Sequence, residues 1–294
     1  MNLSKRLLSL VVGFTAVAAL TACATSSPVA SNGVPPLSGF EIKQLLASPT
    51  RSELDRQTDV RRQPDRWLAF VGVAPAMRVL DLSAGGGYTT ELLARAVGPA
   101  GRVYGQSAPR RTDAQPPAAP EGGAAAPAGA SVNEFSIGPG ISSGPRLSSP
   151  DALQQRSARA SLANIEAVVR PFEDPVPDAA RARGLDLVTL MYNYHDLGHQ
   201  GVDREKMNRA VWSALKPGGV YVIADHAGRP GSGISESGTL HRVEEAFVRR
   251  EVEQAGFRFV AAGDFLRNPA DPRDLNVPEG GQRKDGFILK FVKP

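Results

Sequence analysis

The chain has a single cysteine, no basic stripe and a short N-terminal apolar segment. Cys23 is the only cysteine among 294 residues, so it cannot be half of an internal disulfide. The apolar segment from Leu7 to Leu20 is too short for a membrane-spanning helix, and its flanking residues are those of a signal peptide. The formal net charge is +4, and no basic run is interleaved with aromatic residues. We therefore expect no nucleic-acid partner.

The N-terminal sequence has the features of an export signal. Lys5 and Arg6 precede the apolar segment, which predicts a secretory signal peptide over residues 1–22. The segment ends in Leu-Thr-Ala-Cys, and this ending resembles the bacterial lipobox, in which the cysteine is acylated and becomes the mature N-terminus. The resemblance implies a membrane partner through a lipid anchor on Cys23, and a place in the bacterial cell envelope facing the periplasm or the outer surface. The plainer alternative is an ordinary signal peptide with an incidental cysteine.

Composition divides the rest of the chain. We assign residues 23–51 to the anchor cysteine and a tether, rich in Ser, Pro, Ala and Gly up to about residue 36, with helical patterning from near Gly39. Residues 52–294 are assigned to one large α/β domain. Within this domain, residues from about 108 to 149 are rich in Pro, Ala and Gly with few large apolar side chains, which predicts a disordered insertion. An active-site lid is the alternative.

The most informative stretch runs from Arg78 to Ala96. An apolar run ends at Leu82, three consecutive glycines follow at 85–87, and a helix-period pattern then begins. This order predicts strand, glycine turn and helix. Glycines permit a tight turn and a close approach of a ligand to the backbone, and the amides that open the helix favour polar or anionic groups. The stretch therefore predicts a ligand site, although a turn that binds nothing is the plain alternative.

Spacing discriminates between ligands. A dinucleotide fingerprint requires a third glycine where Thr90 stands and an acid about twenty residues on, and 103–107 holds no carboxylate. The strand acid Asp81 instead comes two residues before a turn of form S-x-G-x-G. This pattern resembles motif I of class I S-adenosylmethionine-dependent methyltransferases, with Ser83 in place of the usual first glycine. The resemblance implies that S-adenosylmethionine is the cofactor, that Gly85 and Gly87 let its methionine part lie against the backbone, and that Asp81 faces its ammonium end.

Strands and helices alternate along the domain, which predicts a doubly wound α/β sheet. Further strands are expected at Arg102–Gly105, Ile165–Val169, Leu185–Met191, Val220–Ala224, Phe257–Ala261 and Phe287–Val292, and a late helix at Thr239–Ala255. The late pair of strands also resembles the ending of these methyltransferases. That resemblance implies a Rossmann-like, mostly parallel seven-stranded sheet of order 3-2-1-4-5-7-6 with the last strand antiparallel.

Ligands of such sheets bind at the carboxyl ends of the strands. The resemblance implies that the cofactor contacts follow the first four strands, and the candidate residues are Asp81, Ser83, Gly85, Gly87, Gln106, Ser107, Glu173, Asp174 and Asn193. Glu173 or Asp174 would bond the adenine amino group. Gln106 and Ser107 stand where the family has its ribose-binding acid, and a neutral acceptor there binds a hydroxyl less strongly than a carboxylate does.

Candidate catalytic groups follow the fourth and fifth strands. His195 titrates near neutrality in isolation and is the candidate base, with Asp196 or His226 as its neighbour. The alternative is that His195 and Asp196 only cap the next element. A metal site at His195, His199 and His226 is not expected, because the loop that carries the first two includes a glycine and lacks a helix to fix their spacing.

Two functions remain open. The first is a methyltransferase acting on an unidentified small-molecule or envelope acceptor. The second is a non-catalytic ligand-binding lipoprotein that keeps the fold, because a fold does not determine an activity and export takes the domain away from the cytoplasm, where the cofactor is made. The sequence names neither the acceptor nor an oligomeric state.

The lipid anchor gives the first prediction. Cys23→Ala should release the mature protein from membranes, because multiple acyl chains are what would hold it at the bilayer. Metabolic labelling with a fatty acid measures the modification directly. Absence of label on the wild-type protein would contradict the assignment.

Overall fold

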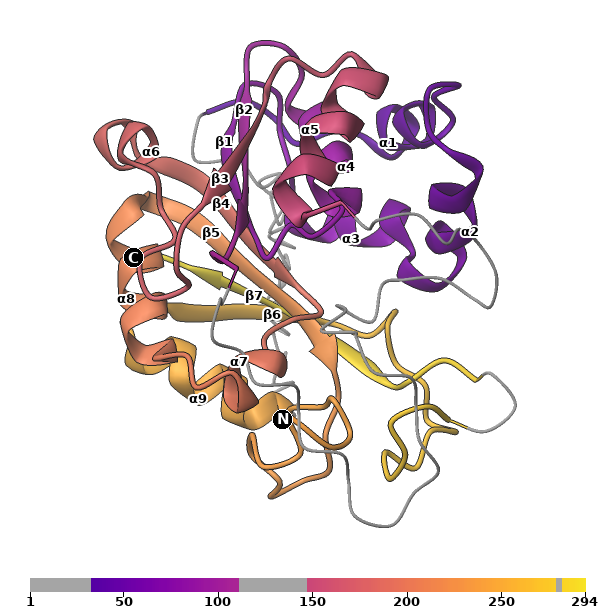
Figure 1. Ribbon diagram of the computed structural model, residues 1–294, viewed down its shortest axis with the longest axis vertical. Coiled ribbons are helices and arrows are strands. Elements are labelled where there is room, and N and C mark those ends of the chain that lie inside the picture. Colours follow the sequence, from indigo (N-terminus) through magenta and orange to yellow (C-terminus); the bar gives the residue numbers. More distant parts are fainter. Residues whose placement is uncertain (1–32, 111–146, 279–281) are drawn as a thin grey trace, which may run out of the picture.

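The computed structural model describes residues 33–110, 147–278 and 282–294, and the strands of this part form one seven-stranded sheet (Figure 1). The strand order is β3-β2-β1-β4-β5-β7-β6, and β7 runs antiparallel to both of its neighbours. This confirms the expected fold. The strands are β1 (Arg78–Leu82), β2 (Arg102–Ser107), β3 (Ile165–Val169), β4 (Leu185–Met191), β5 (Leu215–His226), β6 (Arg258–Gly263) and β7 (Gly286–Val292).

The centre of the sheet is the pair β1 and β4, where the strand order changes direction. These strands are parallel, with Val79 opposite Leu187 and Leu80 opposite Val188. Every residue of β4 is buried, as its nearly continuous apolar sequence predicts for a strand covered on both faces. The buried carboxylate of Asp186 is satisfied, since it accepts from Lys216 Nζ at 2.7 Å and from the Arg78 amide at 2.8 Å.

Helices cover both faces of the sheet (Figure 1). One apolar core lies under α1, α3, α4 and α5, and a second lies under α6, α8 and α9. Among the described residues, no helix is both long enough and apolar enough to span a bilayer. The helices are α1 (Gly39–Leu46), α2 (Glu53–Arg62), α3 (Pro64–Val71), α4 (Tyr88–Val97), α5 (Ser149–Ala160), α6 (Asp178–Arg183), α7 (Asp196–His199), α8 (Arg204–Ala214) and α9 (Glu245–Gln254).

Helix α1 lies within the range 23–51 that was assigned to anchor and tether. It begins with a reciprocal capping box between Ser38 and Glu41 and buries Ile42 in the core beneath α3 and α4. The ordered part of the chain therefore begins before residue 52. Cys23 and residues 111–146 of the expected insertion lie outside the described residues.

The expected helix over Thr239–Ala255 begins only at Glu245, so its predicted start is wrong. The reason is a long-range contact. The Val243 amide donates to the His226 carbonyl at 3.1 Å and the Val243 carbonyl accepts from the Gly228 amide at 2.8 Å, which holds this segment against the end of β5. Helices α6 and α7 were not predicted, because both are too short to show a clear period.

Close packing of β2 against α5 gives the second prediction. A Cβ added at Gly105 would lie 2.3 Å from Leu153 Cδ2 and 3.2 Å from Ala84 Cβ. Gly105→Ala should therefore lower the free energy of unfolding by about 1–3 kcal/mol, the usual cost of overpacking. Urea denaturation measures the change.

Gly39→Ala is the matched control, since nothing lies within 4 Å of the added Cβ. We expect it to leave stability unchanged or to raise it by up to about 1 kcal/mol, because alanine is the better helix former. Equal effects of the two substitutions would contradict the packing described for β2.

Candidate functional site

The turn after β1 has a backbone that glycine suits best. Ser83, Gly85 and Gly87 all adopt left-handed conformations, with φ of 56°, 54° and 83°. At Gly87 a side chain is excluded by space as well, because a Cβ would lie 2.5 Å from Leu153 Cδ1. Gly86 is exposed, and Gly87 begins α4 with no side-chain cap on the first amides of the helix. The turn therefore offers uncapped backbone donors at the carboxyl end of a central strand.

Gln106 is a support of this turn. Its Oε1 accepts from the Ser83 amide at 3.0 Å, its Nε2 donates to the Arg170 carbonyl at 2.6 Å, and its side chain is fully buried. Each end of the amide therefore makes one bond within the protein, and these bonds hold the end of β1 and the residue after β3 in place. Ser107 differs: its Oγ is buried and has no hydrogen-bond partner among the described residues. Ser107 is therefore the polar group at the end of β2 that is able to accept or donate a bond to a ligand.

Asp81 lies directly beneath the turn, at 1% exposure. One carboxylate oxygen accepts from Thr90 Oγ1 of α4 at 2.6 Å, and the other accepts from Thr189 Oγ1 of β4 at 2.8 Å. Burial raises the pKa of this carboxyl from its ordinary 3.8 to about 6, although the two hydroxyl donors and nearby Arg62 favour the charged form. Asp81 thus connects three central elements and carries an incompletely compensated negative charge.

The two acids after β3 have different surroundings. Asp174 forms ion pairs with Arg170 and Arg181, so its carboxylate is engaged within the protein. Glu173 accepts from the Asp203 amide at 3.2 Å and lies outside this ion-pair cluster. Of the two residues expected to contact adenine, Glu173 is the one whose carboxylate forms no ion pair among the described residues.

Helix α2 lies over the glycine turn. Its Arg62 is 6% exposed and stacks on Tyr88 of α4 and on Tyr192 after β4, at 5.0 and 4.7 Å from the ring centroids. Burial lowers the pKa of this guanidinium to about 10, which leaves it charged at neutral pH. Arg62 therefore places a cation between the turn after β1 and the segment after β4.

A second contact clamps α2 to the turn. Arg156 of α5 donates from Nε to the Gly86 carbonyl at 2.6 Å, and its Nη1 reaches Asp55 of α2 at 2.7 Å and Glu91 of α4 at 2.8 Å. These groups are largely buried, so the contact is of a kind that strongly destabilises the fold when one partner is removed. Three helices meet at one arginine beside the turn.

All four histidines of the chain lie together at the carboxyl ends of β4 and β5. The ring centroid of His195 is 5.8 Å from that of His226 and 5.6 Å from that of His241, and His199 is 5.8 Å from His241. His241 was missed because the sequence analysis placed it inside the expected helix Thr239–Ala255. The signal that the sequence did hold is the scarcity of histidine, with four copies among 294 residues.

His195 is fixed between two carboxylates. Its backbone amide and ring Nδ1 contact the two oxygens of Asp225 at 2.8 and 2.6 Å, and its Nε2 lies 3.1 Å from Asp196 Oδ1. The same Asp196 oxygen lies 3.0 Å from His241 Nδ1, and its other oxygen accepts from Asn193 Nδ2 at 2.9 Å. The structure thus brings together three predicted site residues, His195, Asp196 and Asn193.

The titration of this cluster differs from the sequence expectation. Burial alone would favour a neutral His195 ring, but Asp225 and Asp196 outweigh it and raise the pKa of His195 to about 10. His195 is therefore an imidazolium at neutral pH, and the expectation of a ring that titrates near neutrality is wrong. Burial and the nearby cations Lys284 and His195 hold the pKa of His226 well below its usual range, so His226 is neutral.

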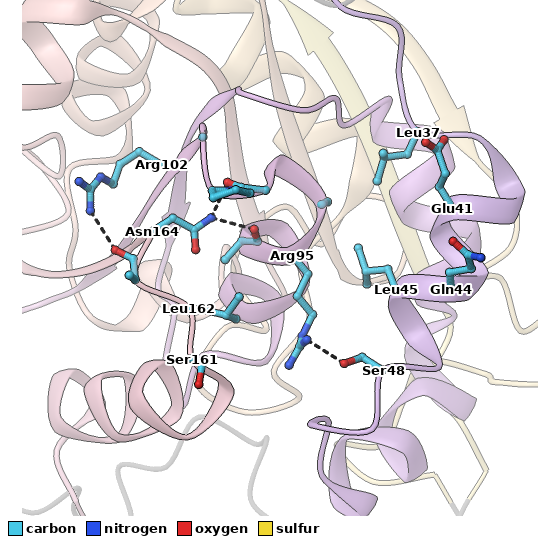
Figure 2. Close-up of a pocket in the computed structure, with 16 residues that line it drawn as sticks. Leu37, Glu41, Gln44, Leu45, Ser48, Arg95, Arg102, Ser161, Leu162 and Asn164 are labelled. Carbon is cyan, nitrogen blue, oxygen red and sulfur yellow. Dashed lines mark hydrogen bonds between the residues drawn. The ribbon is translucent and has the colours of Figure 1, made fainter.

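A large pocket lies at the amino ends of β2 and β3, on the other side of the sheet from the strands' carboxyl ends (Figure 2). It has a volume of about 720 Å³ and is bordered by α1, the end of α4 and the loops that precede β2 and β3, with Leu45, Arg95 and Asn164 among its lining residues. Asn164 donates to the carbonyls of Ala94 and Gly98 there, and these bonds hold the loop before β3 against the end of α4. Because ligands of such sheets bind at the carboxyl ends of the strands, this pocket is not the predicted cofactor site.

The chain matches no known family profile and no curated protein sequence. Solved structures do match. The crystal structure of an S-adenosylmethionine-dependent methyltransferase from Aquifex aeolicus has a TM-score of 0.50 and 18% identity, over 88% of this chain and 100% of that one. A protein from Galdieria sulphuraria, assigned as a sarcosine dimethylglycine methyltransferase, has a TM-score of 0.52 and 18% identity, over 83% and 91%.

A third match is the Haloferax volcanii complex between the Trm112 methyltransferase activator and a protein assigned as a methyltransferase, at a TM-score of 0.51 and 17% identity, over 87% of this chain and 96% of that one. The chain has the methyltransferase fold. At these identities the likeness concerns the fold, and the activity has to be argued from the site.

Asp81 gives the third prediction. A carboxyl with a raised pKa binds its proton more tightly in the folded state, so its contribution to stability falls as pH rises from about 4 to about 6. Asp81→Asn lacks this titration. The wild type should therefore lose free energy of unfolding relative to Asp81→Asn as pH rises. The difference, variant minus wild type, should grow by on the order of 3 kcal/mol between pH 4 and pH 7 and then stay level. Urea denaturation across this pH range measures the difference.

Asp264→Asn is the control, because that side chain is 93% exposed. Its difference from the wild type should vary little over the same range. A stability difference for Asp81→Asn that does not change with pH would contradict the burial described for this carboxylate.

Proposed function

We propose that the protein binds S-adenosylmethionine at the carboxyl ends of β1 and β2 and transfers its methyl group to a small-molecule or envelope acceptor. The observation that carries the proposal is the turn after β1. Three of its residues take left-handed conformations and its helix amides have no side-chain cap, at the point where the strand order changes direction. The methyltransferase fold makes this the position at which such a cofactor would lie.

The residues around the turn fit the cofactor. The backbone at Gly85 and Gly86 would hold the methionine part, with the charge of Asp81 behind it to balance an ammonium or sulfonium group. The unpartnered hydroxyl of Ser107 would bond a ribose hydroxyl, and a buried polar atom without a partner is one that a ligand can satisfy. Glu173 would face the adenine. Bound there, the cofactor supplies an electrophilic methyl group on sulfur.

The residues after β4 and β5 would serve the acceptor. Neutral His226, partly exposed and packed at 5.4 Å against the Tyr192 ring, is the group able to take a proton from the acceptor. His195 would hold the end of β4 against the end of β5 through Asp225. In this arrangement His226 takes the role of base, and Asp196 and His195 position the segment around it.

We further propose that this domain is a lipoprotein anchored through Cys23 in the bacterial envelope. What supports the anchor is the lipobox-like ending of the N-terminal apolar segment. Export separates the domain from the cytoplasmic supply of cofactor, and for that reason a ligand-binding protein without catalysis is the second outcome that an experiment has to distinguish.

The fourth prediction tests the cofactor site. Ser107→Ala should weaken S-adenosylmethionine binding by about fivefold, the equivalent of one neutral hydrogen bond. Because the hydroxyl has no partner among the described residues, its loss should leave the free energy of unfolding unchanged or slightly higher. Calorimetric titration measures the affinity and a thermal melt measures the stability.

Ser213→Ala on the exposed surface of α8 is the matched control and should leave affinity unchanged. A wild-type protein that shows no binding would contradict S-adenosylmethionine as the cofactor. Binding without transfer of labelled methyl groups to envelope extracts or small molecules would favour a ligand-binding protein without catalysis.

A further inference from the structure

Three side chains at the carboxyl ends of β4 and β5 present potential metal ligands to one point. His195, Asp196 and His241 each offer one ligand atom, and these atoms lie within 4.8 Å of one another. Two of the pairs are in direct contact through Asp196 Oδ1, at 3.1 Å from His195 Nε2 and 3.0 Å from His241 Nδ1. The residues come from the start of α7 and from a loop 45 positions further along, which only the fold brings together.

The groups behind these ligands are arranged as they are in metal sites. His195 Nδ1 contacts Asp225, which is fully buried, so Nε2 is the nitrogen left to face the centre. Metal-bound histidines generally have their other ring nitrogen held by a carboxylate or a carbonyl in this way. The second oxygen of Asp196 accepts from Asn193 Nδ2, which orients Oδ1 toward the two rings. Two of the three ligands are therefore fixed before any ion binds.

The third ligand is fixed by its backbone. His241 has φ of 49°, a left-handed conformation that is costly for histidine. The next residue, Arg242, is fully buried and bonds Asp271 at 2.8 and 3.2 Å, and Val243 is bonded to the end of β5. The surrounding structure thus holds the His241 ring over Asp196. Its side chain is 28% exposed, which leaves a path from solvent.

We propose that His195, Asp196 and His241 bind one divalent transition-metal ion, and that His195 releases its Nε2 proton to solvent as the ion binds. Two imidazoles and one carboxylate favour ions such as Zn²⁺, Fe²⁺ or Co²⁺ over Mg²⁺ and Ca²⁺, which prefer oxygen ligands. Three protein ligands leave at least one position for water or another molecule, as in catalytic metal sites. The set differs from the one that the sequence analysis rejected, because His241 replaces His199 and His226.

Binding of the ion does not depend on the proposed methyl transfer. If the proposed methyl transfer also holds, on which this step rests, an oxygen or sulfur of the acceptor could occupy the open position. The metal site is supported by the three ligand atoms and by the hydrogen bonds that Asp225 and Asn193 make to two of the ligand residues.

The fifth prediction is a Co²⁺ titration of the metal-stripped full chain, without a histidine tag and in a Cys23→Ala background, because a thiolate is a competing ligand. Visible absorption and calorimetry should show one Co²⁺ bound per chain. His241→Asn should weaken binding by at least about a hundredfold, more than the usual effect of losing an outer partner. Asparagine is chosen because it tolerates a left-handed backbone.

His199→Gln is the matched control. His199 lies in the same cluster but bonds Ser237, and its loss should change affinity by no more than about threefold. Asp196→Asn is a second ligand variant, which decides the matter if His241→Asn fails to fold by circular dichroism. It too should weaken binding by at least about a hundredfold.

The proposal would be overturned by a wild-type chain that shows no saturable one-site binding up to about 1 mM Co²⁺. It would also be overturned by a folded ligand variant that binds as well as the wild type, or by a His199→Gln loss as large as that of His241→Asn. Titration of the same samples with S-adenosylmethionine reports separately on the proposed function.

Discussion

The reversal of strand order between β1 and β4 is the constraint on which the candidate site depends. Chain segments that leave these two strands diverge, so the space between them at the carboxyl edge is not filled by a crossover helix. The turn at 83–87 borders one side of that space and the histidines after β4 and β5 border the other. Helix α2 lies above, with Arg62 between the two sides. The turn after β1 and the segment after β4 take their positions from that one feature of the topology.

Buried negative charge lies on both sides of this space. On the β1 side, Asp81 is negative and only partly compensated by hydroxyl donors, which suits a cationic ligand. Across the gap, one imidazolium, His195, lies between the two carboxylates of Asp225 and Asp196, so this row also keeps a net negative charge. A divalent metal ion that replaced the Nε2 proton of His195 would bring a larger positive charge to that row than the proton does.

Local sequence patterns predicted the parts of the molecule that local physics determines. The apolar run of β4 and the sequence around Ser83, Gly85 and Gly87 define a buried strand and a tight turn without help from elsewhere. The site was less predictable, because its chemistry is long-range. The sequence could not show that Gln106 bonds Ser83 and Arg170. Nor could it show that Asp225, at the end of another strand, contacts His195 and raises its pKa. His241 is positioned by a loop whose path is set by the end of β5.

The arginine clamp described beside the turn couples parts of the chain that are distant in sequence. Arg156 bonds the Gly86 carbonyl while it pairs with Asp55 and Glu91, so the turn shares one buried cation with α2, α4 and α5. A ligand that binds the turn more tightly when α2 is packed beside it would stabilise that packing, and loss of the packing would weaken the ligand's binding by the same factor. Helix α2 would then act on ligand affinity without touching the ligand.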